Sequence, residues 1–367
     1  MHVMEIHMSQ RLTQVIGIVM FGGCAPSDAV REPHVLGGHA ELVDNVGPPA
    51  VRNGAGSAQD RDPRRRGSDD LDGFKAGTSG PIVEVQTRST TYASVSGICL
   101  EDDGRKAWGG LGYVTCPITT RGGELGQDER DYGDGHDHPE DCDEDELFVL
   151  AGYGASATWH APTGRVALKM DSVFTGGLMQ SGVVALGLSG GACLATLLED
   201  VGSAPIEVDL PPAVCSEHTD LSIDRASNTA WFANGTLWRL AGDGTFDALS
   251  DHAGNLLVYD DATATLLTAT EGTPTLSSLD LEGLERWSVE LAGPLIELAA
   301  LGDTGVVVAL SSTTPSPTLH FIDANTGDEL RSEATLPDVD DLTTSADGSV
   351  IGATAFRQVY FYDVRVR

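Results

Sequence analysis

The sequence predicts an all-β protein with the β-propeller architecture, and two observations carry this prediction. Beyond Pro81, apolar runs of strand length alternate with turn signals, and no long helical period appears. One strand pattern also recurs at offsets of 42, 43 and 40 residues, at Leu237-Trp238, Leu279-Asp280, Ile322-Asp323 and Tyr362-Asp363. A fixed period of about 40 residues with four strands per unit is typical of propeller blades. A β-sandwich with coincidental spacing is the alternative.

The N-terminus has the features of an export signal, so residues 1–23 are set aside before the fold is assigned. Arg11 precedes an apolar stretch, Leu12–Phe21, which is too short to span a bilayer. The "FGGC" that ends at Cys24 resembles a bacterial lipobox, although Phe21 stands where that family usually has Leu. The resemblance implies a signal peptide over residues 1–23 and lipidation of Cys24. An ordinary cleaved signal is the alternative.

The same resemblance predicts a location. Ala25, rather than Asp, follows Cys24, which among envelope lipoproteins favours the outer membrane or the cell surface. Translation from Met8 instead of Met1 would give a more compact signal, and the sequence leaves both starts open. Residues 24–80 are rich in Gly, Pro, Asp, Arg and Ser. Such a segment buries too little apolar surface to offset its ordering entropy, so we expect a disordered tether.

The propeller occupies residues 81–367, and its strands group into six four-stranded blades, with seven as the alternative count. The stretch "LHFIDANTGDEL", residues 319–330, is the third-to-fourth-strand hairpin of one blade. The last blade is one strand short. "PIVEVQT" at residues 81–87 has no other place, so we expect this N-terminal strand to pair with the last blade and close the ring. An unpaired outer edge there would be an aggregation hazard.

One repeat carries a family resemblance. "LSSLDLEGLERWSVEL" resembles the repeat of pyrroloquinoline-quinone-type (PQQ-like) propellers, which are similar in build to WD40 propellers, and "FIDANTGDELRSEATL" is similar but has Arg331-Ser332 in place of the Trp. Quinone catalysis in that family needs adjacent cysteines, and no two of the six Cys are neighbours. The resemblance therefore implies the fold and non-enzymatic relatives, including outer-membrane assembly lipoproteins.

A strongly acidic segment interrupts the first predicted blade at about residues 117–145. Its centre, residues 124–146, carries twelve carboxylates and one Arg. Carboxylate oxygens suit Ca²⁺, and the ligand candidates are Asp134, Asp137, Asp141 and Asp143. The segment lacks the Asp spacing of an EF-hand loop, so a solvated acidic loop without metal is the alternative. We expect no other cofactor.

The cysteines suit an oxidising compartment. Cys116 and Cys142 flank the acidic segment, so we expect a disulfide that closes its base. Cys193 and Cys215 are expected at the same rim of the next blade, as a second pair. Cys99 lies on an apolar inner strand and is expected to be a buried thiol. The sequence does not determine this connectivity.

Net charge limits the function. A net charge of -33 argues against nucleic acid as a partner, because phosphate binding needs clustered Lys and Arg. No nucleophile set stands out, so we expect a non-enzymatic, monomeric module that binds an envelope or extracellular protein with a basic patch. The expected binding rim lies at one channel mouth and contains Glu217, His218, Asp220, Asp251 and His252. A Ca²⁺-binding surface protein and a propeller hydrolase or lyase are the alternatives.

Overall fold

The structure is a computed structural model. It describes residues 81–88, 97–111, 114–120, 130–131, 138–143, 145–151, 156–335, 338–355 and 358–367. The predicted signal, Cys24, the tether, Asp134 and Asp137 lie outside these ranges. Within the described ranges, no helix is long and apolar enough to cross a membrane.

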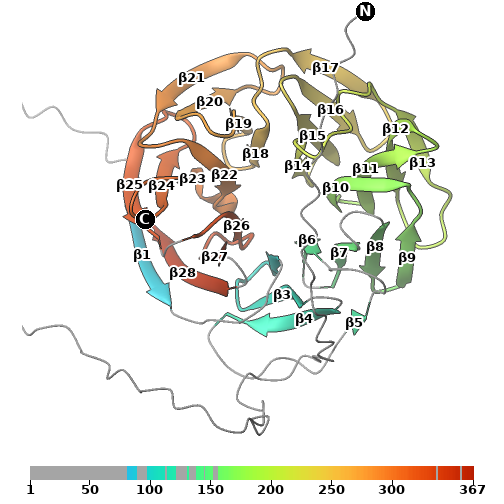
Figure 1. Ribbon diagram of the computed structural model, residues 1–367, viewed down its shortest axis with the longest axis horizontal. Helices are drawn as coiled ribbons and strands as arrows, with labels where there is room; N and C mark the ends of the chain where they lie inside the picture. The colour runs from blue at the N-terminus through green and yellow to red at the C-terminus, as the bar shows by residue number, and fades with distance from the viewer. Residues whose placement is uncertain are drawn as a thin grey trace, which may run out of the picture. The chain divides into compact units, whose positions relative to one another are not determined.

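The described residues form seven antiparallel sheets of four strands each, arranged as the blades of a wheel (Figure 1). In each blade the first strand lies nearest the axis. The blades are numbered here along the chain from the sheet that contains β2. The predicted β-propeller is confirmed, with seven blades rather than six.

The first three blades are built from residues 98–209. Blade 1 contains β2 (Ile98–Leu100), β3 (Lys106–Leu111), β4 (Val114–Thr119) and β5 (Arg130–Asp131). Blade 2 contains β6 (His138–Cys142), β7 (Leu147–Ala151), β8 (Ser156–Ala161) and β9 (Gly164–Leu168). Blade 3 contains β10 (Ser172–Leu178), β11 (Val183–Ser189), β12 (Ala192–Leu198) and β13 (Ile206–Asp209).

The remaining blades follow the same order from the axis outward. Blade 4 contains β14 (Asp220–Asp224), β15 (Thr229–Ala233), β16 (Leu237–Ala241) and β17 (Phe246–Ser250). Blade 5 contains β18 (Leu256–Asp260), β19 (Thr265–Ala269), β20 (Thr275–Leu279) and β21 (Glu285–Glu290). Blade 6 contains β22 (Leu295–Ala300), a short 3₁₀ turn (Gly302–Thr304), β23 (Val306–Ser311), β24 (Thr318–Asp323) and β25 (Glu329–Ala334). Blade 7 contains β26 (Asp341–Thr344), β27 (Val350–Ala355), β28 (Gln358–Val366) and β1 (Val83–Arg88).

The predicted count of six blades is wrong, and the error lies at the acidic segment. The six-blade prediction places β3 and β7 in one blade and treats the residues between them as an insertion. Instead, β4 and β5 complete blade 1, and His138–Cys142 is the first strand of blade 2. The carboxylates of His138–Cys142 hide the strand pattern in the sequence. A strand that borders a polar channel needs no apolar run. β10 was also missed, since "SVFTGGL" carries two glycines.

The core lies between blades, because both faces of each sheet are covered by neighbours. Every residue of β23 is buried. Its alternate residues face opposite ways: Val307 packs with Val258 of blade 5, and Val308 packs with Ile351 of blade 7. Both faces are therefore apolar, and the strand reads as a continuous run. The outer strands, such as Glu285–Glu290, alternate exposed and half-buried residues.

The hairpin over residues 319–330 forms as predicted, as β24, a turn and β25. Asp323 Oδ1 accepts the N–H groups of Asn325 and Thr326 at 2.9 and 3.2 Å, which stabilises the turn. Trp287 of blade 5 donates its indole N–H to Ala324 O at 3.1 Å. A Cβ at Gly327 would come within 2.8 Å of the Trp287 ring, so glycine permits this contact between blades.

The N-terminal strand closes the ring, as the sequence predicts. β1 pairs antiparallel with β28, from Val83 opposite Val366 to Arg88 opposite Phe361. Ile82 and Arg367 exchange two backbone hydrogen bonds of 2.9 Å. Blade 7 therefore combines three C-terminal strands with one N-terminal strand (Figure 1).

Proline at position 86 is expected to weaken this closure. Hydrogen-bonded pairs alternate in an antiparallel ladder, so the pair at Ile82 and Arg367 makes Gln86 and Asp363 a bonded pair too. Gln86→Pro removes that N–H and should lower the free energy of unfolding by about 1–3 kcal/mol in urea titrations. Gln86→Ala keeps the N–H and is the control. Equal urea midpoints for the two variants would contradict this role of β1.

Candidate functional site

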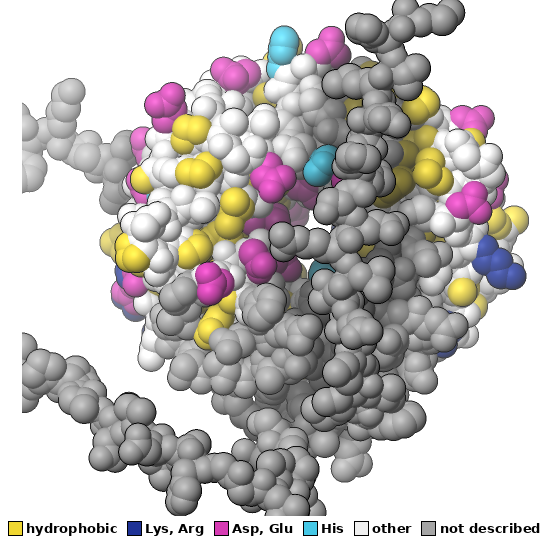
Figure 2. Space-filling model, viewed as in Figure 1, with side chains coloured by type: hydrophobic (Ala, Val, Ile, Leu, Met, Phe, Trp, Pro, Cys, Tyr) yellow, Lys and Arg dark blue, Asp and Glu magenta, His cyan; other side chains and the backbone are white. Residues whose placement is uncertain are grey.

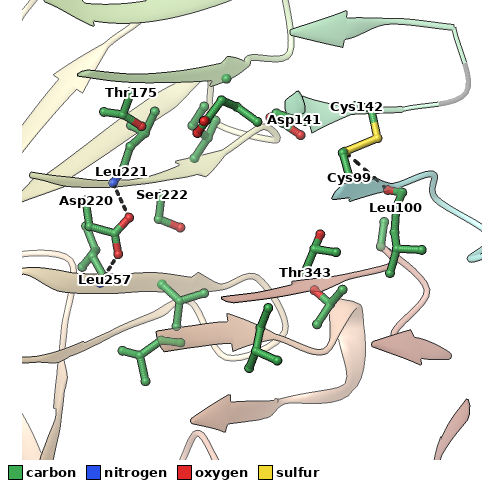
Figure 3. A pocket seen from close by; sticks show the side chains of 18 of the residues that line it. Cys99, Leu100, Asp141, Cys142, Thr175, Asp220, Leu221, Ser222, Leu257 and Thr343 are labelled. Atoms are coloured by element: carbon green, nitrogen blue, oxygen red, sulfur yellow. Dashed lines mark hydrogen bonds between the residues drawn. A yellow bond between two sulfur atoms is a disulfide. The ribbon is translucent and has the colours of Figure 1, made fainter. Parts of the chain in front are cut away.

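The candidate site is a cavity of about 520 Å³ on the axis of the wheel. All seven first strands line it, and each first strand contacts the next around the ring (Figure 3). The lining includes Leu100 of β2, Asp141 of β6, Thr175 of β10, Ser222 of β14, Leu257 of β18, Glu297 of β22 and Thr343 of β26. Six carboxylates also line the cavity, namely Asp102, Glu140, Asp141, Asp220, Glu297 and Asp341. In Figure 2, acidic side chains lie along the left side of the central opening.

Some of these polar side chains connect neighbouring first strands. The N–H of Leu257 donates to Asp220 Oδ2 at 2.6 Å, and the N–H of Tyr259 donates to Ser222 Oγ at 2.8 Å, so β14 is bonded to β18. Asp220 also accepts the N–H of Leu221 at 2.8 Å (Figure 3). The side chains thus supply acceptors for backbone groups at the inner edge of the blades.

Asp141 and Asp143 of the predicted metal site are close together, but they surround an arginine. Arg225 Nη2 lies 2.6 Å from Asp141 Oδ1, and Arg225 Nη1 lies 3.6 Å from Asp143 Oδ2. The other oxygen of Asp141 accepts the Leu178 N–H at 2.8 Å. Burial raises the pKa of Asp141, and the Arg225 charge opposes this shift. This group connects blades 2, 3 and 4.

The described residues contain no group of three or more His, Cys, Asp or Glu side chains arranged to bind a metal ion. Both oxygens of Asp141 already have partners, and Arg225 competes with any cation for Asp143. Calcium binding by the four predicted aspartates stays a prediction, since Asp134 and Asp137 lie outside the described ranges.

A second group of carboxylates lies where the first strands begin, and this end of the cavity is called the channel mouth below. Asp220 and Asp341 are the first residues of their strands, and Glu297 is the third residue of β22. Burial, with the charges of Glu140 and Asp341, raises the pKa of Asp220 to about 7. Burial and the charges of Asp220 and Asp341 raise the pKa of Glu297 well above its usual value. The mouth therefore concentrates carboxyl groups whose ionisation is opposed by burial and by one another.

The predicted binding rim divides into two environments. Asp220 lines the cavity. Glu217, Asp251 and His252 are exposed, as is His218, whose Nε2 lies 3.7 Å from Glu217 Oε1. These four residues belong to the segments that lead into β14 and β18, so they lie on the face of the wheel at which the channel mouth opens. Sequence reasoning missed Glu140, Glu297 and Asp341. The available signal was an acidic residue directly before a Leu in a first strand, as in Glu297-Leu298 and Asp341-Leu342.

The structure corrects one predicted disulfide. Cys142 bonds Cys99, at a sequence separation of 43, and not Cys116. Cys142 belongs to the first strand of blade 2, beside the first strand of blade 1, which carries Cys99. Cys116 lies on the third strand, opposite Gly109. The expected buried thiol at Cys99 is therefore wrong.

The second predicted disulfide is present. Cys193, at the start of the third strand of blade 3, bonds Cys215 in the segment between blades 3 and 4. Both positions lie at the rim where second strands end and first strands begin.

Blade 6 contains a hydrogen-bonded chain that the sequence did not reveal. Ser311 Oγ lies 2.8 Å from His320 Nε2, and His320 Nδ1 lies 2.8 Å from Glu329 Oε1. This is the connectivity of a hydrolase triad. Ser311 and His320 are only 0% and 1% exposed, however, so a substrate cannot reach the hydroxyl in this arrangement. The chain supplies partners for polar groups buried beside blade 5.

Seven four-stranded blades around an axial cavity define the class of this protein as a WD40-like β-propeller. The fold is similar to the crystal structure of the β-propeller domain of Myceliophteria thermophila Cps50 (Swd1), with a TM-score of 0.58. The comparison covers 78% of this chain and 100% of that chain, at 9% sequence identity, so the similarity concerns the fold alone. No protein-family model and no curated protein matches the sequence.

The disulfides generate a prediction. In the chain-entropy model, a bridge across 43 residues stabilises by about 4 kcal/mol. The Cys99→Ser/Cys142→Ser variant should lose stability of this order in chemical denaturation, and the Cys193→Ser/Cys215→Ser variant, with its separation of 22, about 3 kcal/mol. Peptide mapping without reduction checks the pairing. A peptide linking Cys116 to Cys142 would contradict the structure.

Proposed function

We propose that this protein is an exported binding module whose channel mouth takes a positively charged group of a partner protein. The observation that carries the proposal is the axial cavity, lined by six carboxylates from five blades. Among the described residues that line it, Arg225 is the single basic side chain, and it is already paired with Asp141 and Asp143. A cationic group entering the mouth would therefore find acceptors and little competing charge.

Charge complementarity favours a basic partner over other ligands. The exposed Glu217 and Asp251 extend the negative field outward from the mouth. Such a field accelerates encounter with a basic patch, and its effect falls as salt rises. Lys or Arg side chains are long enough to enter a cavity while their backbone stays at the rim. An envelope or extracellular protein with a basic patch fits this surface.

The N-terminal sequence and the disulfides support the proposed place of action. Two disulfides support a compartment outside the reducing cytoplasm. The proposed module is attached to a bacterial outer membrane or cell surface through lipidated Cys24, with residues 25–80 as the tether. This part of the proposal rests on the sequence pattern, since Cys24 lies outside the described ranges.

A peptide-binding measurement tests the proposed mouth. A tetralysine peptide should bind at pH 8 and low salt, and more weakly as salt increases. The variant Asp220→Asn/Glu297→Gln/Asp341→Asn should weaken binding at least about tenfold, since each lost charge contributes of the order of 0.5 kcal/mol at screened distances. The charge-matched control is Glu207→Gln/Glu285→Gln/Glu290→Gln, on exposed positions of the outer strands. Equal loss in both variants would mean nonspecific charge attraction and would contradict the site.

The anchor is tested by fractionation. Cys24→Ala removes the thiol to which lipid is attached and should move the protein from the membrane fraction to the soluble fraction. Ala25→Ser keeps the thiol and is the control. Membrane association that persists in Cys24→Ala would rule out the lipid anchor.

A further inference from the structure

Four carboxylates of the channel mouth, called the mouth group below, come from four different blades and border one cavity. They are Glu140 of blade 2, Asp220 of blade 4, Glu297 of blade 6 and Asp341 of blade 7. The charge of Asp220 acts on Glu297, and the charge of Asp341 acts on both. The cavity thus brings together side chains that are far apart in the sequence.

Other charged groups face this group from the surrounding strands. His138, on the same strand as Glu140, acts on Asp341 with an opposing charge, while Asp340 adds negative charge beside it. Glu271, which follows β19, adds negative charge near Glu297. His138 Nδ1 also lies 3.0 Å from Glu140 Oε1.

The lining of the mouth has no Lys or Arg of its own among the described residues except Arg225. Arg225 is fixed by Asp141 and Asp143 through contacts of 2.6 and 3.6 Å. The mouth group therefore has an excess of negative charge whenever all four carboxyl groups are ionised. Protons are the available way to reduce the repulsion.

We propose that binding at the mouth is proton-linked: Asp220, Glu297 and Asp341 of the mouth group share protons in the unliganded protein and release them when a cationic group enters. This inference rests on the proposed function and adds its regulation. The mouth is then a pH-dependent site, which binds its partner in neutral to alkaline surroundings and releases it as the surroundings acidify.

The direction of the pKa shifts supports this linkage. Burial and neighbouring charges raise the pKa of Asp220 to about 7, and they raise the pKa of Glu297 and Asp341 as well. A bound positive charge favours the ionised carboxylates and lowers these pKa values, so binding expels protons. Affinity should consequently fall as pH falls through about 7, because the cation must then displace more protons.

The same shifts give a test that needs no ligand. The folded protein binds more protons than the unfolded chain wherever pH lies between the ordinary carboxyl pKa and the raised one. Stability contributed by Asp220 is therefore lost as pH rises through this interval. Asp220→Asn carries no titrating charge, so its urea midpoint should rise relative to wild type between pH 5 and pH 8. Glu297→Gln is the second variant, and it should behave in the same way.

The binding experiment uses calorimetry of the full chain with tetralysine peptide at pH 6 and pH 8. Two buffers of different ionisation enthalpy report the number of protons released. Wild type should bind at least about tenfold more weakly at pH 6 than at pH 8, with proton release, since one pKa unit corresponds to a factor of ten. Asp220→Asn should reduce both effects. Glu207→Gln, which removes an exposed charge from the outer strand of blade 3, should leave both unchanged.

The outcomes separate the two proposals. Equal affinity at both pH values without proton release overturns the linkage and leaves the binding module intact. A pH-independent difference in urea midpoint between wild type and Asp220→Asn also overturns it. Absence of peptide binding at every pH, with the pH-dependent stability difference present, overturns the proposed function and supports proton sharing in the mouth.

Discussion

The first strand of each blade has an edge that faces the axis, and the backbone groups on that edge need hydrogen-bond partners. Neighbouring first strands in blades 4 and 5 do not pair as a sheet; side chains connect them instead. Asp220 and Ser222 accept the N–H groups of Leu257 and Tyr259. Between blades 2 and 3, Asp141 accepts the Leu178 N–H. Carboxylates are good acceptors for N–H groups, so they satisfy the unpaired backbone N–H groups of the first strands. They also place acidic groups along the axis.

This requirement connects architecture to chemistry. Two N–H groups hold the Asp220 carboxylate in position. When ionised, this carboxylate also repels Glu297 across the cavity. At Asp141 the repulsion is relieved by Arg225, which reaches from blade 4 to blade 2. At the mouth, no comparable arginine lines the described cavity beside Asp220, Glu297 and Asp341. One end of the channel is thus neutralised from within, and the other is proposed to be neutralised by protons or by a partner.

The apolar core serves a separate purpose. Each sheet is covered on both faces by neighbouring blades, so clusters such as the one joining Val258 and Val307 extend from blade to blade around the ring. Closure by β1 gives blade 7 its fourth strand, and the Cys99–Cys142 disulfide connects blades 1 and 2 beside the cavity. The apolar contacts between blades, the β1 closure and the disulfide therefore stabilise the first strands that carry the acidic residues. The channel itself can remain polar.

The sequence by itself determined the fold class, the spacing of blades 4 to 7 and the closing strand, and it placed Cys193 and Cys215 at one rim as candidates for a pair. These features are local: an apolar strand, a turn and a fixed interval are all visible along the chain, as in residues 319–330. Seven blades, the Cys99–Cys142 pair and the mouth group required the tertiary structure. β6 has no apolar period, because Glu140 and Asp141 on this strand line the polar cavity. The strand was therefore taken for part of an insertion. Asp220, Glu297 and Asp341 lie up to 121 residues apart, from 220 to 341, and only the circular arrangement of first strands makes them neighbours.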